Sequence, residues 1–225
     1  MEQTLAVQVS DQIGRVDAVW LAPPEPRFLY VLGHGAGAGM RHPFMTQIAQ
    51  RLFVLEVATL RFQFPYMQVG GKRTDPPAVA EATVRAAILK GQELMPGITI
   101  VAGGKSFGGR MTSQLLSRDH SLPVAGLAFL GFPLHAPNKP ARNRAEHLFE
   151  VVQPMLFLQG TRDTLADLEL IREVTSELGA RATLHVVEGA DHSFAVLKRS
   201  GRTHDEVMDE LAATIASWGS APTYP

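Results

Sequence analysis

The fold is decided by one stretch of the chain, Ile98-Thr99-Ile100-Val101-Ala102-Gly103-Gly104-Lys105-Ser106-Phe107-Gly108-Gly109-Arg110. An apolar run leads into the motif G-x-S-x-G and then into a segment with helical spacing. Such a turn from strand to helix holds its serine in a strained, exposed position, and Gly104 and Gly108 permit the turn because a Cβ at either place would collide with a neighbouring strand or helix. The pattern predicts a nucleophile at Ser106. The alternative is a glycine-rich turn with no catalytic role. The prediction therefore depends on whether a suitable base and acid follow Ser106 later in the chain.

Short apolar runs alternate with segments of helical spacing along the whole chain. Runs this apolar suit strands that are buried on both faces of a parallel sheet, and their regular alternation with helices predicts an α/β fold with right-handed crossovers. The expected strands are residues 28–32, 54–60, 98–102, 124–130, 155–158 and 184–187, and the expected helices are residues 42–53, 77–94, 107–118, 165–178 and 203–218.

The N-terminal segment has a different pattern. Residues 4–9 and 15–21 alternate apolar and polar side chains around a turn, which predicts an antiparallel hairpin at a sheet edge. We therefore expect one domain over residues 1–225, with a mostly parallel central sheet, helices on both faces and no large cap domain. Residues 131–150 fall outside the alternation and are the candidate for a lid-like excursion.

The composition excludes several classes of function. The 225 residues include 21 Lys and Arg, 22 Asp and Glu and no Cys, and 45% of them are hydrophobic. A balanced charge argues against nucleic acid or an anionic membrane as partner, and the lack of cysteine excludes thiolate nucleophiles and cysteine-based metal sites. There is no signal-peptide pattern and no run of about 18 apolar residues, so we expect a cytoplasmic protein with a small-molecule substrate. The sequence leaves the oligomeric state open, a homo-oligomer included.

A serine hydroxyl needs a base to become a nucleophile, and the base needs an acceptor that fixes its tautomer. Asp163 follows the apolar run 155–158, and His192 follows the next run, 184–187. The order serine, acid, histidine along the chain is that of one large group of serine hydrolases. Asp167 and Asp191 are the competing acids: we expect Asp167 to lie in the first turn of a helix and Asp191 to shape the loop beside His192.

The loop after the run 28–32 is rich in glycine and reads Gly33-His34-Gly35-Ala36-Gly37-Ala38-Gly39-Met40. An oxyanion hole combines the backbone N–H after the nucleophile, here that of Phe107, with one from such a loop. Ala36 is our candidate for the second donor, with Gly35 and Gly37 as rivals. A dinucleotide loop would need glycine where Met40 stands, and a phosphate loop would need glycine where Thr99 stands, so both nucleotide interpretations are disfavoured.

No second ligand stands at metal-binding spacing from any histidine, so we expect neither a metal nor a cofactor. His185 lies within an expected strand, and we interpret His120, His147 and His204 as solvated surface residues.

At these motifs the chain resembles the α/β-hydrolase superfamily, in particular its small dienelactone-hydrolase-like branch. Closer still, it is similar to small hydrolases named after a testis-expressed protein and after a subunit of an animal histone-acetyltransferase complex. The matching segments are residues 33–37, 60–66, 103–110, 131–135, 160–163 and 189–194. The resemblance implies an α/β-hydrolase fold and a triad of Ser106, Asp163 and His192. It implies little about the substrate.

These observations predict a serine hydrolase of carboxylesterase type that cleaves a small ester, thioester or amide. The alternative is an interaction module that keeps the fold without catalysis. Lys105, directly before the nucleophile, is expected either to steady an anion in the pocket or to lie at the surface. Phe132, Leu134 and His135 follow a strand end on the side of Ser106, and we expect them to line the pocket together with Gly35 and Gly37, although His135 is equally compatible with a plain role in the loop.

Overall fold

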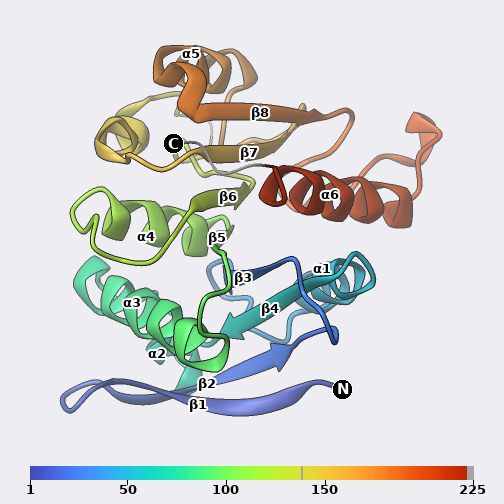
Figure 1. Ribbon diagram of the computed structural model, residues 1–225. Coiled ribbons are helices and arrows are strands. Elements are labelled where there is room, and N and C mark those ends of the chain that lie inside the picture. The colour runs from blue at the N-terminus through green and yellow to red at the C-terminus, as the bar shows by residue number, and fades with distance from the viewer. Residues whose placement is uncertain (138, 222–225) are drawn as a thin grey trace.

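One sheet of eight strands runs through the computed structural model, which describes residues 1–137 and 139–221 (Figure 1). The strand order is β1-β2-β4-β3-β5-β6-β7-β8, in which β2 is antiparallel to β1 and β4 and all other neighbours are parallel. The predicted fold, a mostly parallel sheet with an antiparallel N-terminal hairpin, is confirmed. The strands are β1 (Gln3–Ser10), β2 (Gly14–Leu21), β3 (Phe28–Gly33), β4 (Val57–Phe62), β5 (Ile100–Lys105), β6 (Gly126–Leu130), β7 (Met155–Gly160) and β8 (Ala182–Val187).

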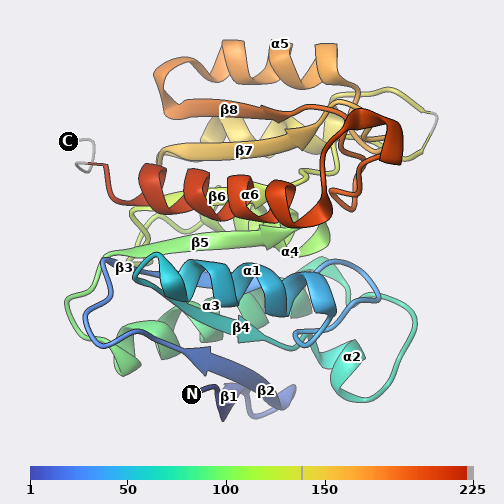
Figure 2. The same ribbon diagram turned by 90° about the vertical axis from the view of Figure 1, so that its right-hand side faces the viewer.

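Helices cover both faces of this sheet. Helices α1 (Pro43–Val54) and α6 (His204–Gly219) lie on one face, and α3 (Pro77–Leu94), α4 (Phe107–Leu116) and α5 (Leu168–Leu178) lie on the other (Figures 1 and 2). The shorter elements are α2 (Pro65–Gln68) and the 3-10 helices η1 (Asn143–Glu150), η2 (Gly179–Arg181) and η3 (Lys198–Ser200). None of the helices within residues 1–137 and 139–221 is long and apolar enough to cross a membrane.

The continuous apolar runs of the sequence arise because both faces of the central strands are buried. In β3, Tyr30 and Leu32 pack toward α1 and α6, whereas Leu29 and Val31 pack toward α3 and α4 on the opposite face. Successive side chains of a strand point to opposite faces, so a strand covered on both sides needs apolar residues at every position.

The expected strand at residues 54–60 begins later than the apolar pattern suggests. Helix α1 continues to Val54, whose side chain is exposed, and the chain reverses at Glu56, which has a φ of 61°. Only then does β4 begin at Val57. The apolar run spans a helix end and a strand start, and periodicity alone does not separate the two.

Residues 131–137 and 139–150, the described part of the candidate lid, lie beside the sheet. The 3-10 helix η1 buries Ala145 and Leu148 and contacts α4 and α5. The described part of this segment contributes to the core on the α4 and α5 side of the sheet.

A close contact between backbones joins α4 to β3. A Cβ added to Gly108 would lie 2.4 Å from the carbonyl carbon of Gly33, and one added to Gly104, which has a φ of +144°, would lie 2.1 Å from the Gly33 oxygen. Side chains are therefore excluded at both positions. The helix that carries the expected nucleophile at its start lies directly on the two central strands.

We expect Gly108→Ala to lower the free energy of unfolding by about 3 kcal/mol or more, because the new methyl group would push against backbone that cannot move aside. Gly97→Ala is the control, since a Cβ added at Gly97 meets no heavy atom within 4 Å, although Gly97, unlike Gly108, has a positive φ of +83°. That change should cost only about 1 kcal/mol. Urea unfolding of the three proteins measures the difference, and equal costs would contradict the steric explanation.

Candidate active site

Ser106 lies on the sharp turn between β5 and α4. Its φ of 48° and ψ of −109° fall outside the regions that residues with a side chain prefer. The turn is held by the Ser106 N–H, which donates to the carbonyl of Leu130 at the end of β6 (3.2 Å). This conformation keeps the side chain partly exposed at the carboxyl edge of the sheet.

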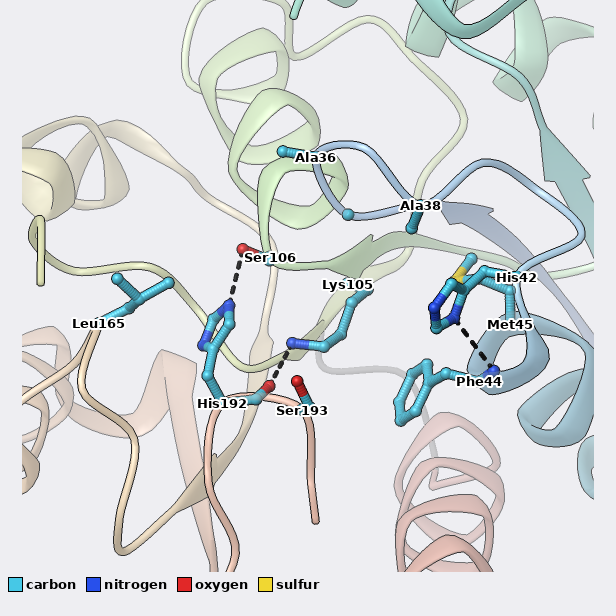
Figure 3. Close-up of a pocket in the computed structure, with 11 residues that line it drawn as sticks. Ala36, Ala38, His42, Phe44, Met45, Lys105, Ser106, Leu165, His192 and Ser193 are labelled. Atoms are coloured by element: carbon cyan, nitrogen blue, oxygen red, sulfur yellow. Dashed lines mark hydrogen bonds between the residues drawn. The ribbon is translucent and has the colours of Figure 1, made fainter. Parts of the chain in front are cut away.

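His192 and Asp163 lie in line behind the Ser106 hydroxyl. The Nε2 atom of His192 is 2.9 Å from Ser106 Oγ (Figure 3). Its Nδ1 atom is 2.7 Å from Asp163 Oδ2. Asp163 follows β7 and His192 follows β8, so the two parallel strands bring their loops to the same edge as β5. The structure thus joins in one chain of hydrogen bonds three residues that are 86 and 29 positions apart in sequence.

Asp163 is buried, and both of its oxygens accept hydrogen bonds. The backbone N–H of Leu165 donates to Oδ1 (2.8 Å), and the side-chain amide of Gln159 donates to Oδ2, which is also the oxygen that faces His192. Gln159 was missed by the sequence analysis. Its signal was a polar residue near the end of the otherwise apolar strand β7.

The two competing acids have other partners. Asp167 caps α5 by accepting from the N–H groups of Glu169 (3.0 Å) and Leu170 (3.1 Å). Asp191 accepts from the N–H groups of Ser193 (2.8 Å) and Ala195 (3.0 Å) and so shapes the turn beside His192. Neither carboxylate faces the imidazole ring.

The glycine-rich loop after β3 is fixed by hydrogen bonds to its backbone. The carbonyl of Gly35 accepts from His34 Nδ1 (2.8 Å) and from the N–H of Ala38 (3.1 Å). In a trans peptide the C=O and the following N–H point in opposite directions, so the N–H of Ala36 points away from His34. The N–H of Gly37 donates to the hydroxyl of Tyr66 (2.9 Å), which leaves Ala36 rather than Gly37 with an N–H that has no acceptor among residues 1–137 and 139–221.

His34 is the residue that holds this loop from behind. The backbone N–H of Phe64 donates to its Nε2 atom (3.2 Å), so the ring proton is on Nδ1 and points to Gly35. The ring is fully buried, and this burial lowers the pKa of His34 to about 4. His34 is therefore neutral at physiological pH, which is the state that this pair of hydrogen bonds requires.

A cavity of about 320 Å³ opens beside Ser106 (Figure 3). Its walls come from the glycine-rich loop after β3, the start of α1, the end of β5 and the loops that carry Asp163 and His192. It is lined by Gly35, Ala36, Ala38, His42, Phe44, Met45, Lys105, Ser106, Leu165, His192 and Ser193. The sequence analysis missed the contribution of α1, although the glycine-rich loop leads directly into that helix.

Four residues that were expected to line the pocket do not line it. Phe132 packs on the rings of Phe129 and Phe157, and Leu134 is fully buried in the same core. His135 accepts from the N–H of Asp167 (2.8 Å) and hydrogen-bonds the Ala136 carbonyl (2.9 Å). The chain turns at Gly131, with a φ of +71°, and carries residues 132–135 under the Asp163 loop instead of into the cavity.

The fourth is Gly37, which lies at the exposed tip of its loop. By contrast, Gly35 and Lys105 do line the cavity, and Lys105 is 9% exposed rather than a surface residue.

His147 is not the solvated surface residue that the sequence analysis predicted. His147 is half-buried, and its Nε2 atom is 2.7 Å from Ser113 Oγ of α4. Burial, with the nearby charges of Arg110 and Arg118, lowers its pKa to about 4. Among the described residues, no group of three His, Asp or Glu side chains could hold a metal ion.

Comparison with known families identifies the family to which this fold belongs. The model of the family described as alpha/beta hydrolase domain matches residues 26–220, which is most of the chain. The chain belongs to the alpha/beta hydrolase family. The confirmed resemblance covers the fold from the start of β3 to the end of α6.

Solved structures of other alpha/beta hydrolases superpose on nearly the whole chain. A serine hydrolase without lid from Xanthomonas campestris has a TM-score of 0.75 at 19% identity, covering 100% of this chain and 97% of that chain. A dienelactone hydrolase from Anabaena variabilis has a TM-score of 0.76 at 16% identity, with coverage of 97% and 96%. An esterase domain from Rhodothermus marinus has a TM-score of 0.73 at 15% identity and covers 98% of both chains. At these identities the likeness establishes the fold.

Acid should destabilise this alpha/beta hydrolase through His34. The unfolded chain binds a proton at a histidine pKa of about 6.5, whereas folded His34 does so only at about 4. Between these values the unfolded state holds more protons, so stability is full above about pH 6.5 and falls by up to about 1.4 kcal/mol per pH unit as the pH drops. His147 acts in the same direction.

Urea unfolding between about pH 7 and about pH 5 measures this slope, which His34→Gln should make shallower by up to one proton. An unchanged slope in His34→Gln would contradict a buried neutral imidazole at this position.

Proposed function

We propose that this alpha/beta hydrolase is a serine hydrolase that cleaves a small carboxylic ester, thioester or amide through an acyl-enzyme on Ser106. The observation that carries the proposal is the chain of hydrogen bonds from Ser106 to His192 to Asp163, with its 2.9 Å and 2.7 Å distances, at the edge of an open cavity. Nucleophile, base and orienting acid are then within reach of one another before any substrate binds.

In the first half of the reaction, Ser106 Oγ attacks the carbonyl carbon and its proton passes to His192 Nε2. The imidazolium is stabilised by the Asp163 carboxylate at Nδ1. Collapse of the tetrahedral intermediate breaks the bond to the leaving group, which takes the proton from Nε2. In the second half, water attacks the acyl group with His192 again as base, and Ser106 regains its proton when the acid leaves.

The oxyanion would be stabilised by the backbone N–H groups of Ala36 and Phe107. Phe107 is the first residue of α4, where an N–H has no acceptor within the helix, and the partial positive charge of the helix start favours an anion. Ala36 contributes the opposing N–H, whose direction is set by the two hydrogen bonds to the Gly35 carbonyl. Donors held this rigidly need no reorganisation as the charge develops.

The solved structures that resemble this chain support the same assignment by their names. They include a serine hydrolase, a dienelactone hydrolase and an esterase domain, all of which are hydrolases of the same fold. We infer the ester-like substrate from that likeness together with the geometry, because fold alone does not determine chemistry.

We expect a fluorophosphonate probe to label Ser106, and Ser106→Ala to abolish both the labelling and the hydrolysis of p-nitrophenyl butyrate. Ser113→Ala is the matched control, because Ser113 of α4 also lies beside an imidazole, that of His147 in η1, but does not line the cavity. The Ser106→Ala protein should keep its stability within about 1 kcal/mol, since removing one hydroxyl from a strained, partly open turn leaves little cavity. A folded wild-type protein that the probe does not label would instead favour an interaction module.

We expect Asp163→Asn to lower kcat by about 10⁴, the effect of that change in a serine protease triad. Here Gln159 and Leu165 both donate to the Asp163 oxygens, so the amide group of an asparagine would face a donor in either orientation. Asp191→Asn serves as the comparison and should retain most of the activity. Rates are compared per folded molecule, as judged by circular dichroism, and a larger loss in Asp191→Asn would reverse the assignment of the acid.

A further inference from the structure

Lys105 places a positive charge on the floor of the cavity beside the nucleophile. Its ammonium donates to the carbonyl oxygen of His192 (2.5 Å), and the rings of Phe194 and Phe44 lie at 5.4 Å and 6.0 Å from Nζ to their centroids. An ammonium has three N–H donors, and only this one acceptor is found for Lys105 among residues 1–137 and 139–221. Figure 3 shows the side chain crossing the cavity between Ser106 and Phe44.

No carboxylate of the described residues forms an ion pair with Lys105 within 4.0 Å. The negative charges that act on it are those of Asp163 and Asp191, which are already engaged with His192 and with the turn at Ser193 and Ala195. A buried cation without a direct counter-ion is costly, and an anion placed beside it recovers part of that cost. The cavity therefore favours a negatively charged guest.

The remaining groups around the ammonium fit an anion of modest size. Figure 3 shows the Ser193 hydroxyl pointing in the direction of Lys105 Nζ, and no hydrogen bond of that hydroxyl occurs within the described part of the chain. Phe44, Met45 and Leu165 make the walls apolar. A single cation with one hydroxyl matches a carboxylate on a short hydrocarbon chain better than a doubly charged phosphate.

We propose that Lys105 and Ser193 bind a carboxylate of the substrate, so that this hydrolase acts on anionic esters of the type of half-esters of short dicarboxylic acids. The inference rests on the proposed serine hydrolase function. Ser106 and Lys105 are adjacent in the chain at the end of β5, so a scissile carbonyl at Ser106 leaves the acyl chain to run over Lys105 toward α1. The ester group is cut at Ser106 while the carboxylate is held beside it at Lys105 Nζ.

Competition against p-nitrophenyl butyrate tests the proposal. The competitors are the monoethyl esters of succinic, glutaric and adipic acids, each compared with the neutral ester in which the free carboxylate is replaced by its amide. This measurement gives an inhibition constant whether or not the competitor is itself cleaved. At least one carboxylate should compete about tenfold or more better than its amide, the size expected for a charge-assisted hydrogen bond.

Three variants identify the residues responsible. Lys105→Met, which keeps an apolar chain of similar length, should reduce the ratio of carboxylate to amide to about one, and Ser193→Ala should reduce it about threefold. Lys90→Met is the control, because it removes the same charge from the surface of α3, where Lys90 pairs with Glu93. The ratio is taken within each variant, so a general loss of activity cancels. If Lys105→Met does not fold, Ser193→Ala and the pH series below still decide.

The pH series uses the charge of Lys105 itself. Burial lowers the pKa of Lys105 to about 8, against the opposing influence of Asp163 and Asp191. The other titratable groups at the cavity are His192 and, at its mouth, His42. The ammonium is present at about pH 7 and lost at about pH 9.5, so the preference for the carboxylate should fall over this interval in the wild type and be absent at both pH values in Lys105→Met.

A ratio near one at every chain length, in a protein whose Ser106 is labelled by the fluorophosphonate probe, overturns this inference and leaves the hydrolase function intact. A folded protein that is neither labelled nor active overturns the proposed function, and the inference falls with it. A preference for the carboxylate that survives in Lys105→Met also overturns the assignment.

Discussion

The close approach of α4 to β3 is the constraint on which the site depends. Gly33 and Gly108 touch backbone to backbone, and Gly104 presses on the same strand from β5, so the first turn of α4 lies directly over the centre of the sheet. This contact leaves Ser106 no ordinary conformation and holds it at a φ of 48°. The strained backbone of Ser106 persists because the surrounding glycines fix both β5 and α4. This backbone conformation turns the Ser106 hydroxyl outward.

The same rigidity extends to the loop that faces Ser106. Segment 60–66 lies behind that loop, and each of its contacts fixes one part of the loop backbone. The amide oxygen of Gln63 accepts from the N–H of Met40 (2.8 Å), and Tyr66 accepts from Gly37. His34 connects the two segments by accepting from Phe64. The resemblance at residues 60–66 therefore has a physical meaning: these residues do not touch the cavity as a group, but they set the direction in which the Ala36 N–H points.

The sequence predicted the elements and their order because the signals for them are local. A strand buried on both faces must be apolar throughout, and the turn at Ser106 must be rich in glycine, so both are visible in the letters alone. Ser106, Asp163 and His192 could be chosen together because parallel strands place the loops that follow them at one edge of the sheet.

The walls of the cavity were harder to predict because they depend on the direction that the chain takes after a turn. At Gly131 the left-handed backbone sends Phe132 and Leu134 into the core, whereas a strand-end argument would place them beside Ser106. Gln159 was missed for a related reason. A single polar residue in an apolar strand gives no sign of a function, and only the path of the loop after β7 shows that Asp163 lies within hydrogen-bond distance of its amide. The direction in which these side chains point depends on strand register and turn geometry, which the hydrophobic periodicity of the sequence does not reveal.

Charge balance connects Lys105 to the chemistry at Ser106. At rest, the buried residues Asp163 and Lys105 carry opposite charges, and His192 contacts both, Asp163 through its ring and Lys105 through its carbonyl oxygen. In the proposed mechanism, attack by Ser106 would create an imidazolium and an oxyanion together, so the balance would be kept, which matters because an uncompensated charge is costly in a buried site. The carboxylate of an anionic substrate would add one negative charge and would pair with Lys105. Asp163 is then left to the imidazolium alone, and each positive charge formed or held in the site has its own anion.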